Sequence, residues 1–141
     1  MPGVRHIYLS AEDLDAMRRF YGWLLALEEI YYSAEEQLLA FDCDGLQFTI
    51  YGADVEPTAA GWATQPGWSG GTETTVSWSV ELPEDDFRAA VDRLVSAGVV
   101  ALHDEPLWVG YWSFPVRDPM GNTVEVTWPE PSDAETRIWS G

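Results

Sequence analysis

The feature that most constrains the fold of this 141-residue chain is an internal repeat. The five residues that begin at His6 align with the five that begin at Ser77, an offset of 71, and an amphipathic pattern follows each segment. In both patterns apolar residues recur at three- and four-residue steps, which is typical of the buried face of a helix. The first pattern contains Leu14, Met17, Phe20, Tyr21, Leu24 and Leu27, and the second contains Phe87, Val91, Leu94 and Val95.

Capping signals mark the ends of the two expected helices. Ser10, with Asp13 three residues later, predicts a capping box at the start of the first helix. Pro83 and the three acidic residues after it are typical of the first turn of the second helix, because the acids face its positive end. Gly98 suits a left-handed cap at the end of that helix.

Strand-like runs and tight turns follow each helix. Asp44-Gly45 predicts a hairpin turn, and residues 118–122 form the corresponding turn of the second half. The offset between the halves has grown there to 76, measured from Gly45 to Gly121. Each half therefore reads as β-α-β-β-β. The expected strands after the helices span about residues 28–33, 37–42 and 46–52, then 99–103, 111–117 and 123–128.

This pattern predicts a single domain made of two modules. The expected parts are a first module at about 4–52, a connection rich in Gly, Pro and Trp at 53–73, a second module at about 74–128, and a tail at 129–141.

The net charge of the chain argues against some classes of binding partner. The chain has 24 acidic and 7 basic residues, a formal net charge of −17, which argues against nucleic acids because their affinity depends on basic side chains. No run approaches the roughly 20 apolar residues of a membrane span, and the N-terminus lacks the apolar run of a signal peptide. Cys43 is the only cysteine, so no intramolecular disulfide forms, and we expect a cytoplasmic protein. Cys43 is either a reactive thiol or, as we favour, a small residue beside a turn.

A histidine on the first strand, together with Asp118-Pro-Met-Gly-Asn-Thr-Val-Glu125, resembles the vicinal oxygen chelate superfamily. This group contains glyoxalase I, extradiol dioxygenases, fosfomycin-resistance enzymes and bleomycin-resistance proteins. The resemblance covers residues 4–128 and implies an α+β fold. Its two βαβββ modules form a cupped mixed sheet around a small-molecule cavity, with helices on the convex side, and the proteins are commonly homodimers. In its metal enzymes four strand positions bind one divalent metal, and here these are His6, Thr49, Ser77 and Glu125.

Strand alternation separates polar and apolar faces around these positions, because successive side chains point to opposite faces. If His6 faces the cavity, so do Tyr8 on the same strand and Gln47, Thr49 and Tyr51 on the fourth strand. In the second module the same alternation predicts that Ser77, Ser79 and Glu125 face the cavity, while Val124 and Val126 pack under the helix.

The predicted donor set is poor in metal ligands. A catalytic transition-metal site uses at least three His or carboxylate ligands, and Ser and Thr hydroxyls are weak substitutes. Only His6 and Glu125 qualify, so we expect no cofactor. The alternative is a divalent metal held by His6 and Glu125, with Gln47 or a residue of a partner chain completing the site.

The eight tryptophans are the most unusual feature of the composition. Trp62, Trp68, Trp108 and Trp112 are expected near the cavity mouth as aromatic walls, together with Tyr8 and Tyr51. Trp23 and Trp78 are expected in the core, Trp128 under the helices and Trp139 in the tail. Alternatively, the rings fill the core or a subunit interface. Aromatic faces bind flat rings and attract cations, and an acidic protein concentrates cations around itself.

These features favour a non-catalytic binding or sequestration protein of the bleomycin-resistance type, whose ligand is aromatic and neutral or cationic. The alternative is a metal-dependent lyase, isomerase or transferase of the same superfamily, with a reduced or rearranged metal site. The expected ligand-binding residues are His6, Tyr8, Gln47, Thr49, Tyr51, Trp62, Trp68, Ser77, Trp108, Trp112 and Glu125.

Overall fold

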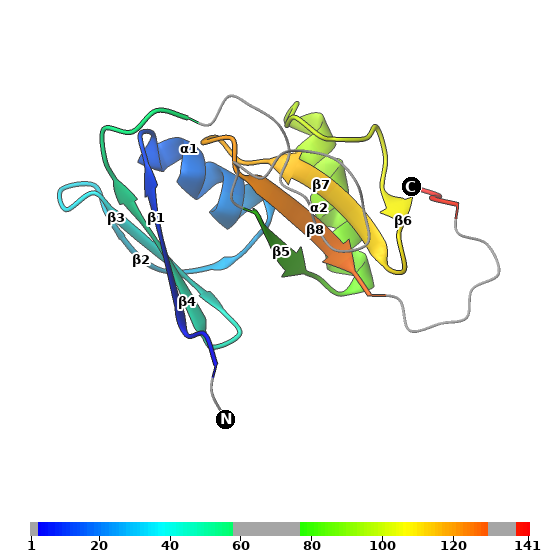
Figure 1. The fold of residues 1–141 in the computed structure, drawn as a ribbon, viewed down its shortest axis with the longest axis horizontal. Helices are drawn as coiled ribbons and strands as arrows, with labels where there is room; N and C mark the ends of the chain where they lie inside the picture. Colours follow the sequence, from blue (N-terminus) through cyan, green and yellow to red (C-terminus); the bar gives the residue numbers. More distant parts are fainter. Residues whose placement is uncertain (1–2, 58–76, 130–137) are drawn as a thin grey trace. The chain divides into compact units, whose positions relative to one another are not determined.

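The computed structural model describes residues 3–57, 77–129 and 138–141 (Figure 1). The chain divides into two compact units, Met1–Pro57 and Thr58–Gly141. Each unit contains one four-stranded sheet. Neither helix in the described part of the chain combines the length and the apolar character that a membrane span requires.

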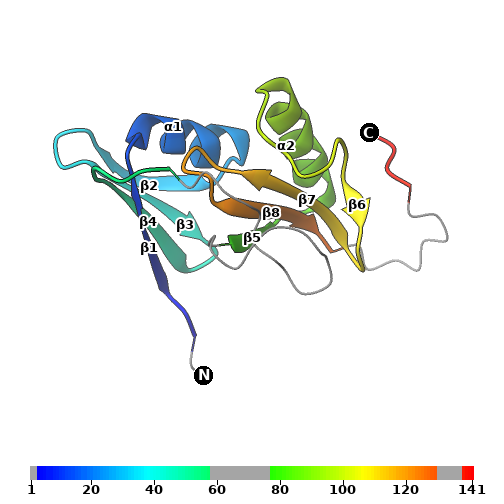
Figure 2. The same cartoon turned by 45° about the horizontal axis from the view of Figure 1, so that its top comes forward.

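The first unit is a β-α-β-β-β module in which the first strand returns to pair with the last. Its elements are β1 (His6–Ala11), α1 (Leu14–Arg18) with a π-helical continuation (Arg19–Leu24), β2 (Glu28–Ser33), β3 (Leu38–Cys43) and β4 (Leu46–Gly52). The strand order is β1-β4-β3-β2, with β1 parallel to β4 and the other pairs antiparallel. The helix lies across one face of this sheet (Figure 2).

The second unit repeats this topology. Its elements are β5 (Ser77–Glu81), α2 (Glu84–Ser96), β6 (Leu107–Trp108), β7 (Trp112–Arg117) and β8 (Thr123–Trp128). The strand order is β5-β8-β7-β6, with β5 parallel to β8. The predicted architecture of two βαβββ modules is confirmed.

The two parallel strand pairs share one register. His6 lies opposite Gln47 in the first unit, and Ser77 lies opposite Thr123 in the second. Two residues further on, Tyr8 lies opposite Thr49, and Ser79 lies opposite Glu125. The internal repeat of the sequence is therefore also present in the strand pairing, where equivalent residues of the two units have equivalent partners.

The core of each unit lies between its helix and one face of its sheet. In the first unit Tyr21 is buried and packs edge-on against Phe48, with ring centroids 5.0 Å apart, while Ile50 of the same strand face is also buried. In the second unit Phe87 and Leu94 of α2 are buried, as are the apolar sheet residues Phe114, Val116, Val124 and Val126. The predicted packing of Val124 and Val126 under the helix is confirmed.

Local signals located most turns and helix ends. Asp44 and Gly45 both have positive φ angles of 52° and 84°, as a type I′ hairpin turn requires. Gly98 has a φ of 70° just after α2. The predicted capping box on Ser10 is wrong, because Ser10 is still in β1, and Asp13 caps α1 by accepting a hydrogen bond from the Ala16 amide at 3.0 Å.

The predicted strand at 99–103 is also wrong. Only an isolated bridge joins Ala101 to Val116, and the fourth strand of the sheet is β6. Leu102 donates its amide to the Pro115 carbonyl at 3.0 Å, but a proline has no N–H with which to return a bond on that side. A proline in the neighbouring strand therefore interrupts the ladder.

Trp23 is the clearest error among the predicted core residues. Its side chain is 54 % exposed, with the Arg19 guanidinium 4.4 Å from its ring centroid. Leu24, the next residue, is buried instead. Trp23 therefore lies outside the buried face that Phe20, Tyr21 and Leu24 form in the π-helical continuation.

Candidate functional site

The first group of polar side chains lies where β1 pairs with β4. His6 Nε2 is hydrogen-bonded to Thr49 Oγ1 at 3.1 Å, and Gln47 Nε2 donates to the same hydroxyl oxygen at 3.1 Å. Thr49 is buried, whereas His6 is exposed at the start of its strand. The parallel register brings these three predicted site residues together.

Two tyrosines extend this face of the first unit. The Tyr8 ring stacks on the His6 ring, with centroids 4.3 Å apart and planes inclined by 15°. Tyr8 is 64 % exposed and Tyr51 is 44 % exposed. Both alternate in phase with His6 and Thr49, so they share the face of the sheet that α1 does not cover. The first unit thus presents an exposed aromatic surface beside an imidazole.

The second group surrounds Glu125, which is only 1 % exposed. Its Oε1 accepts hydrogen bonds from Ser79 Oγ at 3.1 Å and Tyr111 Oη at 3.0 Å. Its Oε2 accepts one from Ser113 Oγ at 3.0 Å and a longer one from Tyr111 Oη at 3.3 Å. Three neutral hydroxyls thus satisfy a buried carboxylate. We call these four residues the Glu125 cluster.

The environment of Glu125 changes the acidity of Tyr111. Burial, followed by the hydrogen bond to Glu125 and the charge of that residue, raises the pKa of Tyr111 to about 12. All three effects favour the neutral phenol over the phenolate. Tyr111 is therefore a hydrogen-bond donor at neutral pH.

Sequence reasoning missed Tyr111 and Ser113 as members of this cluster. The signal that could have found Ser113 is the hairpin register, which places Arg117 opposite Thr123 and Pro115 opposite Glu125. Alternation from Pro115 then puts Ser113 on the Glu125 face. Tyr111 lies just before β7, and alternation along the predicted strand at 111–117 would have placed it on the same face as Ser113.

The expected aromatic walls of the second unit are placed differently. Trp112 is buried, and its ring stacks on Trp128 with centroids 6.4 Å apart and contacts Trp139 at 5.4 Å. Because Trp112 directly precedes Ser113, it lies on the opposite face of β7 from Glu125. Trp108 pairs with Trp112 and contacts its ring at 5.6 Å. In the second unit the structure therefore fits the alternative interpretation, in which the tryptophan rings fill the core.

Three expected site residues have no described side chain. Trp62 and Trp68 lie outside the described residues. Ser77 begins β5 opposite Thr123, and only its backbone position is described.

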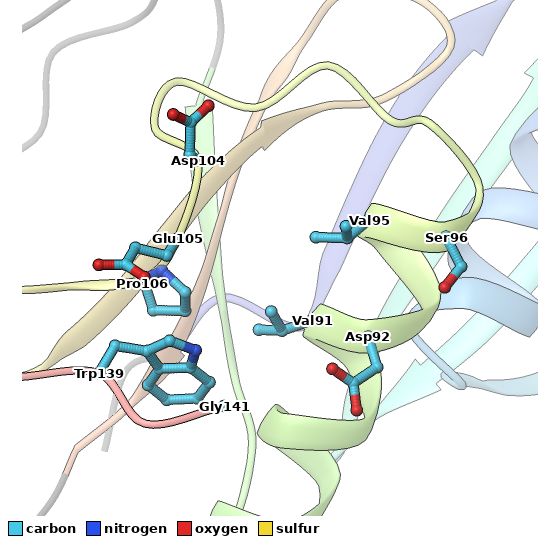
Figure 3. A pocket seen from close by; sticks show the side chains of 9 residues that line it. All are labelled: Val91, Asp92, Val95, Ser96, Asp104, Glu105, Pro106, Trp139 and Gly141. Carbon is cyan, nitrogen blue, oxygen red and sulfur yellow. The ribbon is translucent and has the colours of Figure 1, made fainter.

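A groove of about 430 Å³ lies elsewhere in the second unit, beside α2 (Figure 3). Val91 and Val95 of α2 point towards Pro106 and Trp139, while the carboxylates of Glu105 and Asp104 point away from them. The groove contains no predicted site residue and no histidine or cysteine. It results from the packing of the C-terminal Trp139 against the unit, whose ring also contacts Phe87 at 5.6 Å.

The donors present do not fit a catalytic transition metal. Among the residues that the structure describes, no group of three or more His, Cys, Asp or Glu side chains is placed to hold a metal ion. His6 shares a hydroxyl with Gln47, and both oxygens of Glu125 accept hydrogen bonds. His6 and Glu125 also belong to different units, so a metal bound by both stays a hypothesis.

Nucleophilic chemistry at Cys43 has little support. Desolvation, followed by the charge of Asp42, raises the pKa of the Cys43 thiol, which lowers its thiolate fraction at neutral pH. Cys43 is the last residue of β3, beside the Asp44-Gly45 turn, as the simpler interpretation predicted.

Solved structures with the same fold come from several kinds of protein. A glyoxalase/dioxygenase from Nostoc punctiforme is 20 % identical, with a TM-score of 0.72 and 92 % of each chain covered. Lactoylglutathione lyase from Agrobacterium tumefaciens is 24 % identical, with a TM-score of 0.60, covering 89 % of this chain and 92 % of its own. The fosfomycin resistance protein FosX from Mesorhizobium loti is 16 % identical, with a TM-score of 0.66, covering 93 % and 95 %.

Sequence comparison gives the family. No curated protein matches the chain. A family model matches residues 3–126, which include both βαβββ modules and Glu125. The chain therefore belongs to the glyoxalase/bleomycin resistance protein/dioxygenase superfamily.

Proposed function

We propose that this protein binds or sequesters a small aromatic molecule, neutral or cationic, in the manner of a bleomycin resistance protein, and does not transform it. The observation that carries this proposal is the exposed aromatic surface around His6. Membership of the superfamily is compatible with binding and with catalysis, because one fold supports many functions.

The aromatic surface has the properties of a ligand wall. Tyr8 and Tyr51 leave large ring areas in water, and the stacked His6 and Tyr8 rings form a flat platform. Exposed apolar surface that gathers on one face commonly marks a binding site. A flat ligand would cover the platform, and a cationic ligand would gain about 0.5–2 kcal/mol from a cation–π contact.

The charge of the chain supports a cationic ligand at longer range. The net charge is −17, and a strongly negative protein raises the local concentration of cations and their rate of association. This attraction acts on any cation, so selectivity has to come from the aromatic surface and from the polar groups beside it.

The polar groups give less support to catalysis. General acid–base chemistry needs a group that can reach the reacting atom. Both oxygens of Glu125 already accept hydrogen bonds from hydroxyls, and His6 Nε2 is hydrogen-bonded to Thr49, so neither group is an uncommitted general base. We therefore expect binding without a metal or other cofactor.

Binding assays with matched variants test the proposal. A panel of planar aromatic molecules, both neutral and cationic, is titrated into the protein and followed by calorimetry. Tyr8→Ala should weaken binding of any hit about tenfold. Trp23→Ala, which removes an exposed ring from the helix side of the same unit, should leave binding unchanged. Failure of the whole panel to bind would refute the proposed function.

Metal analysis provides the second test. Protein purified without chelators should contain no stoichiometric Zn, Ni, Mn or Fe. A stoichiometric metal that is lost in His6→Ala would favour the alternative, a metal-dependent lyase, isomerase or transferase.

A further inference from the structure

We propose that the Glu125 cluster is a subsite for a primary ammonium group. The acceptors are Glu125 Oε1, Ser79 Oγ and Tyr111 Oη. This inference rests on the proposed function and goes beyond it by naming the chemical group that the second unit recognises.

Counting protons shows why these three oxygens act as acceptors. A hydroxyl has one proton to donate and two lone pairs with which to accept. Ser79 and Tyr111 each donate to Glu125 Oε1, at 3.1 and 3.0 Å. The lone pairs of both hydroxyls remain for a donor that approaches from outside. The three oxygens thus carry one negative charge and only acceptor capacity.

No protein cation neutralises this charge among the described residues. The hydrogen-bond partners of the Glu125 carboxylate there are the hydroxyls of Ser79, Tyr111 and Ser113. A buried charge is usually paired with an opposite charge. A ligand cation would supply the missing counter-charge, in a place where little water screens the attraction.

The two edges of the carboxylate differ in accessibility. Oε2 is held by Ser113, which is buried. Oε1 is held by Ser79, which is exposed, and by Tyr111, which is partly exposed. The structure therefore favours approach of a ligand from the Oε1 edge.

The shape of the acceptor set favours an ammonium over a guanidinium. A guanidinium pairs best with both oxygens of a carboxylate at once, and Ser113 occupies the Oε2 edge. An ammonium presents three N–H donors from one nitrogen, the number that Glu125 Oε1, Ser79 Oγ and Tyr111 Oη can accept. The group that the Glu125 cluster would bind is therefore a primary ammonium.

A pair of probes that differ only in the charged group tests the subsite. These are 2-(1-naphthyl)ethylamine and its neutral analogue 2-(1-naphthyl)ethanol, titrated by calorimetry at neutral pH. The amine should bind the unaltered protein at least tenfold more tightly than the alcohol. Glu125→Gln should remove that preference and leave the affinity for the alcohol unchanged.

Matched variants separate a local contact from long-range attraction. Glu84→Gln removes the same charge from an exposed position on α2 and should retain at least half of the preference for the amine. Ser79→Ala removes an exposed hydroxyl that contacts Glu125 Oε1 and should weaken amine binding about threefold. If Glu125→Gln does not fold, Ser79→Ala still tests the subsite.

The possible results also distinguish the subsite from the proposed function. Equal affinity for the amine and the alcohol, or a preference that Glu84→Gln and Glu125→Gln reduce equally, would overturn the subsite and leave aromatic binding intact. Failure of both probes together with the whole aromatic panel would overturn the proposed function, and the subsite with it.

Discussion

Replacing Tyr111 by phenylalanine removes one oxygen atom from the Glu125 cluster and leaves the ring in place. Glu125 is 1 % exposed and would keep only Ser79 and Ser113 as hydrogen-bond donors. A hydrogen bond to a charged group contributes about 1.5–3 kcal/mol. Because Tyr111 is partly exposed, we expect Tyr111→Phe to lower the free energy of unfolding by about 1.5–2 kcal/mol at neutral pH.

The pKa of Tyr111 gives this prediction a pH dependence. In the unfolded chain a tyrosine ionises near pH 10, and in the folded protein burial and then Glu125 raise the pKa of Tyr111 to about 12. The raised pKa therefore contributes stability that is fully present below about pH 10 and is lost as pH rises through about 12. Two pH units correspond to about 2.7 kcal/mol, which solvent screening at a partly exposed ring reduces to about 1–2 kcal/mol.

Urea denaturation followed by tryptophan fluorescence measures the effect, since Trp112 and Trp128 are buried in the same unit. The difference between Tyr111→Phe and the unaltered protein should be constant up to about pH 9.5 and should shrink above it. Tyr31→Phe is the matched control, because its phenol also donates to a carboxylate, Glu36, but at an exposed site. The control should leave the midpoint unchanged. A loss below about 0.5 kcal/mol in Tyr111→Phe, or a difference that stays constant to pH 12, would refute the reasoning.

Two further substitutions test the turn at Asp118 and the C-terminal contact of Trp139, which position the Glu125 cluster. Asp118 is buried and accepts amide hydrogen bonds from Met120 at 2.9 Å and Asn122 at 3.0 Å, so Asp118→Ala should cost about 2–4 kcal/mol in urea denaturation. Asp118→Asn keeps an acceptor oxygen and should cost less; equal losses would show that the hydrogen bonds are not the cause. Trp139 packs against Trp112 and is partly exposed, so Trp139→Ala should cost about 1–2 kcal/mol by the same assay. Ile138→Ala alters an exposed neighbour and should cost nothing measurable, whereas equal effects would show that the tail does not stabilise the unit.

Where sequence prediction succeeded, the signal was local. The strands at 28–33 and 46–52 were predicted at their observed bounds, and the Asp44-Gly45 turn fixes where the second of them begins. The strand at 99–103 failed because its pairing depends on Pro115, which lies on another strand. A pattern within a segment cannot reveal a missing donor on its neighbour.

The residues of the candidate site also divide into those that local sequence patterns placed and those that only the structure places. The turn glycines and the repeat placed Thr49 and Glu125 at equivalent positions of their modules, and alternation put each on the polar face of its own sheet. Trp112 was misassigned because burial on either face of a strand looks the same in sequence. The structure resolves it, since Trp112 stacks on Trp128 on the face opposite Glu125.

The sequence by itself determined the repeat, the order of nearly all the elements and the superfamily, and it placed Glu125 on the polar face of the last strand. Only the tertiary structure decided which groups surround that carboxylate. Ser79 lies 46 residues before Glu125 and Tyr111 lies 14 residues before it. Both reach it because β8 lies between β5 and β7 in the sheet. Hydrogen bonds between distant residues follow from strand order, and strand order is a property of the folded chain.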